Sequence, residues 1–327
     1  YRMVSATLVP GDEDELQTTL NRGAAYAGAL HLHDEIVFFD RYTLSPGARV
    51  ELIRTDFSND LDGSRTSNFN AVFVPGIGAH VEATEWLGVL AGVHSGFSPV
   101  APGQAAEVQP ERSVNYEGGA RLGGPPLRGF TAEAIGFFND YSNLTGECTF
   151  AQGCDDTNIG EQFNAGKVKV AGAEVAAGFE RKFKRGGWLD TDANYTFTWS
   201  RFERSFVSAS PQFGVVEAGD ALPYLPVHVA SLKFAGGMKR WGLWGTLAYN
   251  GQMRDSPSQG AIPDAERIDR FLTFDLGGRV WVNDRASIYL NMMNVTGAEY
   301  MVSRRPLGAR SGRPRFTSVG FKYHFGT

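Results

Sequence analysis

The chain has 327 residues, a formal net charge of −5, 40 glycines and 12% aromatic residues. It contains no apolar run of about 18 residues, which excludes a helical membrane protein. It also lacks a basic stripe, which argues against nucleic acid as its main partner.

Apolar and polar residues alternate along many segments with a period of two, which is the period of a β-strand. The alternation is clear in Arg41–Thr55, Glu111–Leu122, Trp188–Ser200 and Arg315–Phe325. In each segment one face is apolar and the other is polar and often charged. A charge that faces lipid at the middle of a bilayer costs about 2–4 kcal/mol. We therefore expect Arg49, Glu117 and Asn194 to face a wet lumen.

Short and long connections take turns along the chain. The short ones lie near Glu35–Asp40, Ala83–Glu85, Gly123–Pro126, Lys184–Gly187, Gly236–Lys239 and Val282–Asp284. The long ones lie near Gly11–Arg22, Phe57–Asn70, Pro99–Pro110, Thr145–Phe163, Phe206–Leu222, Asp255–Glu266 and Gly297–Pro314. This organisation is typical of a transmembrane β-barrel, whereas a soluble sandwich has no reason to keep all its long loops at one end.

The sequence therefore predicts an all-β protein with one domain over residues 1–327, an antiparallel transmembrane β-barrel. We expect about 14 strands, most of them a little longer than the roughly 9–11 residues that a tilted membrane strand needs.

Cys148 and Cys154 are the only cysteines, and a short polar segment separates them. Neither a histidine nor a third cysteine lies nearby, although a structural zinc site needs about four ligands. We predict a disulfide within one loop and no metal site. A disulfide indicates an oxidising compartment.

Several segments resemble the barrel half of TonB-dependent outer-membrane receptors, most closely those of the ferric-siderophore and ferric-citrate type. They are Trp86–Pro99, Glu111–Arg121, Ala134–Leu144, Val168–Glu174, Leu222–Pro226, Asn291–Tyr300 and the terminal strand. No single segment is diagnostic, but their order and spacing together are specific. In this family a plug domain and a TonB box precede a barrel of about 22 strands with a plugged lumen.

The resemblance implies that this chain is the C-terminal part of such a barrel, without the plug, in the outer membrane of a Gram-negative bacterium. The expected function is active import of a ferric chelate, a siderophore or ferric citrate, with energy coupling through TonB. The expected partners are the chelate, the TonB complex through the plug, and outer-membrane lipid and lipopolysaccharide, with no nucleic acid. No cofactor is expected, because iron enters only as chelated substrate.

The chain shows no nucleophile elbow and no phosphate loop, so we predict that it is not an enzyme. The alternatives to an active-transport receptor are a passive porin-like or structural barrel and, less favoured, an outer-membrane hydrolase. A hydrolase would need a set of serine, histidine and acidic residues that the chain does not supply without arbitrary choices.

The candidate substrate-binding residues are Arg304 and Arg305 in the last long loop, Arg254 with Gln252 near another loop, and His94. Arginine forks suit carboxylate-rich anions such as ferric citrate, because they bind bidentately and remain charged. His94 shares a strand face with two glycines, which leave room beside it. The alternative for the arginines is a solvated loop that pairs with local acids or contacts lipopolysaccharide phosphates.

Overall fold

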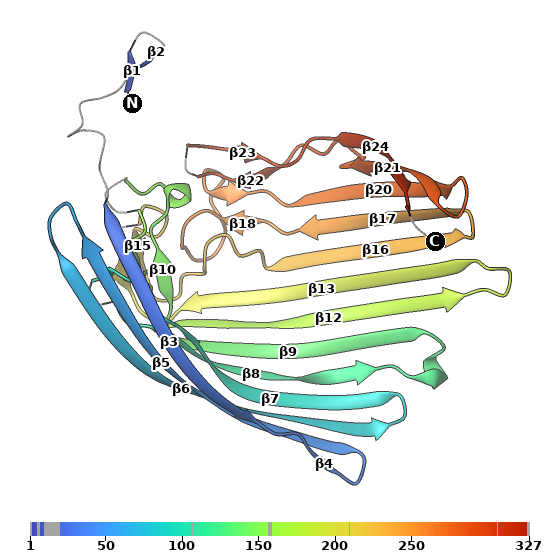
Figure 1. Ribbon diagram of the computed structural model, residues 1–327, viewed down its shortest axis with the longest axis horizontal. Coiled ribbons are helices and arrows are strands. Elements are labelled where there is room, and N and C mark those ends of the chain that lie inside the picture. The colour runs from blue at the N-terminus through green and yellow to red at the C-terminus, as the bar shows by residue number, and fades with distance from the viewer. Residues whose placement is uncertain are drawn as a thin grey trace.

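The structure is a computed structural model that describes residues 2–4, 7–9, 20–105, 108–155, 159–208, 210–305 and 307–325. Most of these residues belong to one antiparallel sheet of 14 strands (Figure 1). The strands are β3 (Asn21–His33), β4 (Ile36–Phe38), β5 (Tyr42–Asn59), β6 (Arg65–Thr84), β7 (Leu87–Ser98), β8 (Glu111–Leu122), β9 (Phe130–Asn143), β12 (Val168–Lys182), β13 (Trp188–Phe202), β16 (His228–Met238), β17 (Trp241–Asn250), β20 (Phe271–Trp281), β21 (Ala286–Met293) and β24 (Phe316–Tyr323). The predicted fold class and strand number are confirmed.

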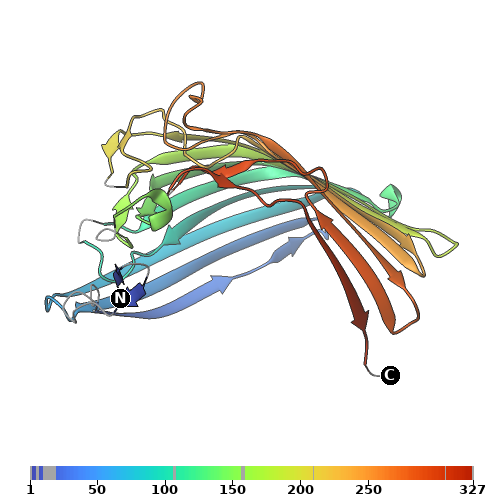
Figure 2. The same cartoon turned by 90° about the horizontal axis from the view of Figure 1, so that it is seen from above.

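Each long strand pairs with its neighbours in chain order, so the sheet is a continuous meander from β3 to β24. Figure 2 shows that the sheet curves strongly. Within the described part of the chain, β3 and β24 are the two end strands and do not pair with each other. The sheet is therefore a curved wall that is open along these two strands.

The six connections predicted to be short lie at one end of the sheet, and the long connections lie at the other end together with the β5–β6 turn (Figure 1). The long connections fold into small hairpins of their own, at the left of that view. These hairpins are β10 (Thr145–Glu147) with β11 (Gln162–Asn164), β14 (Phe206–Val207) with β15 (Val215–Val216), β18 (Met253–Arg254) with β19 (Arg267–Ile268), and β22 (Met301–Ser303) with β23 (Arg310–Ser311). A further hairpin, β1 (Arg2–Val4) with β2 (Thr7–Val9), stands apart from the sheet. The remaining elements are two 3-10 turns, η1 (Pro125–Leu127) and η2 (Phe150–Gln152).

One predicted long loop, Phe57–Asn70, is wrong. Strands β5 and β6 run through it with 18 and 20 residues, and their last pair is Ser58 with Arg65. The segment is polar on both faces, so it lacks the alternation that reveals a strand. The turn itself is short, and Asp62 accepts a hydrogen bond from the Ser64 N–H. Of the predicted loop Gly11–Arg22, residues 11–19 lie outside the described residues.

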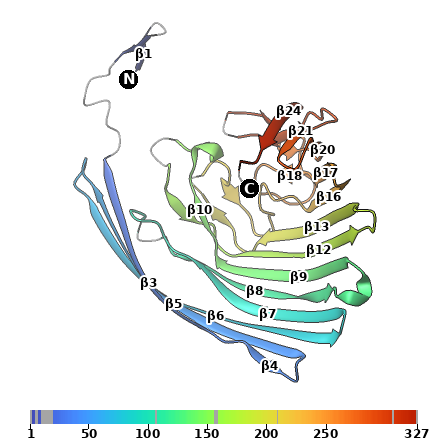
Figure 3. The same ribbon diagram turned by 45° about the vertical axis from the view of Figure 1, so that its right-hand side comes forward.

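The pairing register shows which residues share a face. Asn194 and Phe202 lie eight residues apart on β13, hence on one face, and the loop segments cover Phe202. These segments lie on the concave side of the sheet (Figure 3). Following the register from strand to strand puts Glu117 and Arg49 on this same face. The polar face is thus the inner one, as predicted.

The opposite, convex face is apolar, and no other described segment of the chain covers it. Leu232, Leu290 and Phe321 lie on it and remain between 40% and 64% exposed. An apolar surface that extends over a whole sheet needs an apolar environment, because its exposure to water is unfavourable. The two faces together match the wall of a membrane barrel, with lipid outside and water inside.

Candidate functional site

Two of the long connections, β9–β12 and β13–β16, meet over the inner face, where they share a small apolar core. Its fully buried members are Ala165, Val168, Phe202 and Val216. The ring of Phe202 lies 5.6 Å from that of Phe206 and 6.3 Å from that of Phe213. Because the β9–β12 and β13–β16 connections both contribute apolar side chains, they pack against each other and against β12 and β13.

A polar network joins these loops next to that core, and we call it the loop hub: Tyr224, Asp255, Ser303 and Arg305. The Tyr224 hydroxyl donates to Asp255 Oδ1 at 2.5 Å and lies 3.0 Å from Ser303 Oγ. Arg305 Nε lies 3.0 Å from Asp255 Oδ2, which makes an ion pair. These residues come from three different connections, so the hub fixes the position of each connection relative to the others.

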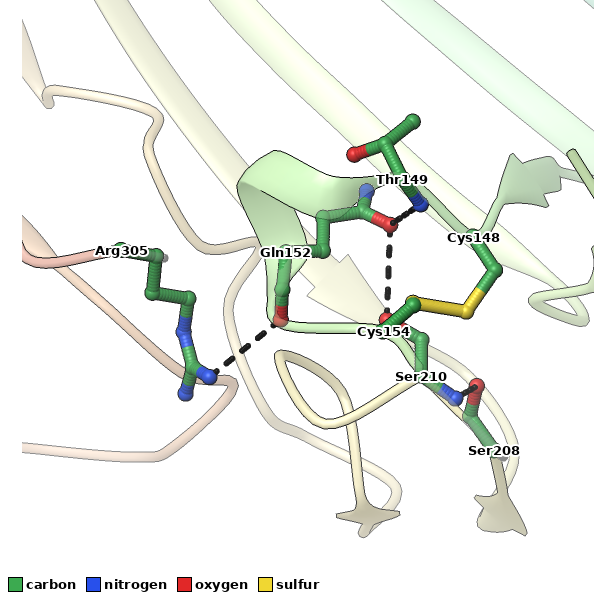
Figure 4. Close-up of a disulfide and its surroundings, with 7 residues drawn as sticks. All are labelled: Cys148, Thr149, Gln152, Cys154, Ser208, Ser210 and Arg305. Carbon is green, nitrogen blue, oxygen red and sulfur yellow. Dashed lines mark hydrogen bonds between the residues drawn. A yellow bond between two sulfur atoms is a disulfide. The ribbon is translucent and has the colours of Figure 1, made fainter. Parts of the chain in front are cut away.

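Arg305 extends the hub to two further partners. Its Nη1 donates to the Gln152 carbonyl at 3.4 Å, and its Nη2 donates to Ser256 Oγ at 3.2 Å. Figure 4 shows the guanidinium reaching the Gln152 carbonyl from the side of the turn that faces away from the disulfide. One arginine from the last loop therefore contacts two other connections.

Within the hub Asp255 is buried and the other three residues are half-buried, and this burial changes the acid–base properties of Tyr224. Asp255 is only 7% exposed. Burial, followed by the hydrogen bond to the Asp255 carboxylate, raises the pKa of the Tyr224 phenol. Tyr224 also has a φ of 56°, an unusual conformation for a residue other than glycine. Its N–H donates to the Arg254 carbonyl at 2.9 Å, which helps to hold this backbone in place.

The predicted arginines lie at this end, but their guanidinium groups contact the protein itself. Arg304 Nε donates to the Arg267 carbonyl at 2.9 Å and Nη2 donates to the Asp264 carbonyl at 3.1 Å. Arg254 Nη1 donates to the carbonyl and hydroxyl of Ser258, both at 2.6 Å. These hydrogen bonds to other loop residues therefore set the conformations of the Arg304 and Arg254 side chains.

Gln252 and His94 are placed differently. Gln252 is exposed beside β18, in the same region as Arg254. His94 lies on the inner face of β7, across from Gly76 and Asn115. Five strands separate β7 from β17, which leads into the Arg254 connection. The structure therefore brings the arginines and Gln252 into one region and leaves His94 outside it.

Sequence reasoning missed Tyr224, Asp255 and Ser303 as members of this site. Asp255 directly follows the candidate Arg254, and Tyr224 stands between two prolines in Leu222–Pro226. Those two features were the available signals. Neither shows which residue a side chain contacts, because the hub connects positions about 30 to 80 residues apart.

Cys148 and Cys154 form a disulfide within one loop (Figure 4). It encloses η2, where the N-cap residue Thr149 and the last residue, Gln152, form a capping box. Both cysteines are buried, at 2% and 6% exposure, and the Cys148 N–H donates to the Glu161 carbonyl. The bond thus fixes the turn whose Gln152 carbonyl receives Arg305.

Replacing both cysteines by serine should loosen this loop and leave the sheet folded. A disulfide that closes so short a loop contributes roughly 2 kcal/mol in the chain-entropy description. We expect faster hydrogen exchange for residues 148–162 and unchanged exchange for the β12–β13 pair, measured by mass spectrometry. Thiol counting on the unmodified protein is the control, and two free thiols there would contradict the bond itself.

Among the described residues, no group of three or more histidine, cysteine or acidic side chains is arranged to hold a metal ion. None of the described helices has the length and apolar character to cross a bilayer.

A family model described as "TonB dependent receptor-like, beta-barrel" matches residues 4–295 of the chain. Three solved structures are similar in fold. The ferric-catecholate import receptor Fiu from E. coli K12, in its closed form, has a TM-score of 0.71 and 17% identity, over 98% of this chain and 47% of that one. The siderophore receptor PiuA from Acinetobacter baumannii has a TM-score of 0.74 and 15% identity, over 93% and 44%. The unliganded ferric citrate transporter FecA has a TM-score of 0.69 and 18% identity, over 92% and 45%.

The chain therefore spans about half the length of these solved structures. At such identities the likeness shows the fold alone. No curated protein sequence matches the chain.

Proposed function

This chain belongs to the TonB-dependent receptor β-barrel family, and from that premise we propose that it is part of a receptor that binds a ferric chelate and imports it with TonB energy coupling. The family is one of Gram-negative outer-membrane receptors, not of enzymes. The observation that carries the proposal is the loop cluster with its arginines, which lies over a polar inner wall. The apolar convex face supports an outer-membrane location.

The proposed substrate is anionic. Arg254, Arg304 and Arg305 gather in neighbouring loops at one end of a chain that is acidic overall. Fiu, PiuA and FecA are described as receptors or transporters of ferric catecholates, siderophores and ferric citrate. Ferric chelates of the catecholate and citrate type carry negative charge, so arginine donors suit them. In this proposal iron is cargo and no cofactor takes part.

The proposed partners follow from the same premise. The shared fold covers roughly half of each solved relative, which supports a plug and further barrel strands in the remaining part of a receptor. TonB would act through that plug. The apolar outer face would contact outer-membrane lipid, including lipopolysaccharide.

Replacing Arg304 and Arg305 together by alanine in the intact receptor should weaken ferric-chelate binding. A hydrogen bond to a charged group contributes about 1.5–3 kcal/mol, so the loss of even one predicts a Kd about 10- to 150-fold higher. Salt should weaken binding to the unmodified receptor, since exposed charges are screened over about 8–10 Å. Titration with ferric citrate and with a ferric catecholate measures both effects.

The matched control is Arg285→Ala, an exposed arginine in a short turn at the other end of the sheet. That variant should bind as tightly as the unmodified receptor. Unchanged affinity in the double variant, with the protein still folded, would leave these arginines a structural role only. Import that persists without TonB would favour a passive pore.

A further inference from the structure

Of the three candidate arginines, one is held by a carboxylate and two by neutral groups. Arg254 and Arg304 donate to backbone carbonyls and a serine hydroxyl. Arg305 is ion-paired with Asp255, whose Oδ2 lies 3.0 Å from its Nε. A carboxylate in this place has the same chemistry as the anionic group of the proposed ligand.

We propose that Asp255 is an internal competitor for Arg305: its carboxylate occupies the place of an anionic ligand group and must give way when such a ligand binds. The identity of that ligand as a ferric chelate rests on the proposed function. The competition itself depends only on the charges in the loop hub. Asp255 is then a residue that sets affinity and selects for anions strong enough to displace it.

The geometry permits such an exchange, because Asp255 does not depend on Arg305 alone. Its other oxygen, Oδ1, accepts the Tyr224 hydroxyl at 2.5 Å. Its N–H donates to the Glu266 carbonyl at 2.9 Å. When Arg305 turns to a ligand, Asp255 would keep both of these contacts. Only its Oδ2 atom would then lose its partner.

The remaining contacts of Arg305 are weak enough to rearrange. They are a 3.4 Å hydrogen bond to the Gln152 carbonyl and a 3.2 Å hydrogen bond to the Ser256 hydroxyl, both longer than is typical for a charged donor. The ion pair with Asp255 is therefore the contact that a ligand must replace. The exchange need not separate the last loop from the β18–β19 connection, because Arg304 also joins them through the Arg267 and Asp264 carbonyls.

A purely structural ion pair and an internal competitor predict opposite results for Asp255→Asn. If the pair only supports the loops, the variant should bind ligand more weakly, because the binding loops lose order. If Asp255 competes, the variant leaves Arg305 without its carboxylate, and an anionic ligand should bind more tightly. The amide has nearly the same shape as the carboxylate and can still accept from Tyr224, so the change removes chiefly the charge.

The experiment measures the Kd of ferric citrate for the intact receptor and three variants. Asp255→Asn should bind about tenfold more tightly, which corresponds to about 1.4 kcal/mol. Tyr224→Phe removes the bridging hydroxyl but leaves the ion pair, so it should not bind more tightly. Adding Arg305→Ala to Asp255→Asn should abolish the gain. Equal or weaker binding by folded Asp255→Asn would overturn the proposal.

A second measurement separates this proposal from the proposed function. Phenylglyoxal modifies accessible arginines, and peptide mass spectrometry reports the rate at Arg305. Asp255→Asn should raise that rate, and iron-free citrate should protect Arg305. An unchanged rate, or a raised rate without protection by citrate, would overturn the competition. If the unmodified receptor bound no ferric chelate at all, the proposed function would fail while this measurement still decided the role of Asp255.

Discussion

Replacing Phe202 by alanine should destabilise the loop cluster by about 3–5 kcal/mol, the range for removing a buried aromatic ring. The ring is fully buried and lies between the sheet and the loops, against Phe206 and Phe213. Its loss would open a cavity that the β9–β12 and β13–β16 connections share, so these two connections should loosen together. Hydrogen exchange of residues 206–222 and chemical unfolding of the intact protein measure the two consequences.

The matched control is Phe150→Ala, a ring of the same size in the same cluster that is 55% exposed. Folding removes much less apolar area from water at Phe150 than at Phe202. The expected loss of stability on replacing Phe150 is therefore below about 1 kcal/mol. Equal losses in the two variants would mean that the shared apolar core does not hold the loops.

Replacing Leu232 by arginine should destabilise the folded protein in a bilayer by about 2–4 kcal/mol, the cost of a charge on the lipid face at mid-membrane. Leu232 lies at the middle of β16 on the convex face, paired with Ala193 and Leu247. Equilibrium unfolding from lipid vesicles by urea measures the change. The cost arises because the residues paired with position 232, Ala193 and Leu247, have no polar side-chain atom to solvate the guanidinium.

The neighbouring residue provides the control. Ser231 points to the inner face, where it pairs with Asn194, and Lys233 on the same face stands across from Asp192. Ser231→Arg should therefore cost much less than Leu232→Arg. If the two substitutions cost the same, or if Ser231→Arg cost more, the assignment of the inner and outer faces would be wrong.

The fold was predictable because the residues within a single strand already show which of its faces is apolar and which is polar. Alternation along Glu111–Leu122 and Trp188–Ser200 distinguishes the lipid side of each strand from its water side. A register slip of one residue would move every side chain of the strand to the opposite side. The strand ends of β5 and β6 were not predictable in this way. Arg65–Asn70 and their partners are mostly polar on both faces, so no apolar–polar alternation marks them as strand.

The candidate site was predictable as a region and not as a set of contacts. A cluster of arginines in the last loop indicates where positive charge gathers, and the structure places Arg304 and Arg305 there among other loops. Their partners lie far away along the chain: Gln152 is separated from Arg305 by 153 positions and Arg267 from Arg304 by 37. No local pattern records such contacts. His94 was chosen for the space beside it, and free space exists at many positions along the inner wall.

The two longest strands have a further consequence. The β5–β6 hairpin ends in a turn that takes no part in the loop hub or its apolar core, with Leu61 half exposed and open space around Gly63. Its polar tip is therefore the part of the rim where mutation is least constrained by packing. Sequence drift should accumulate there first, and a foreign peptide spliced between Leu61 and Gly63 would be displayed in solvent while Asp60 keeps its contacts with Leu20 and Arg22.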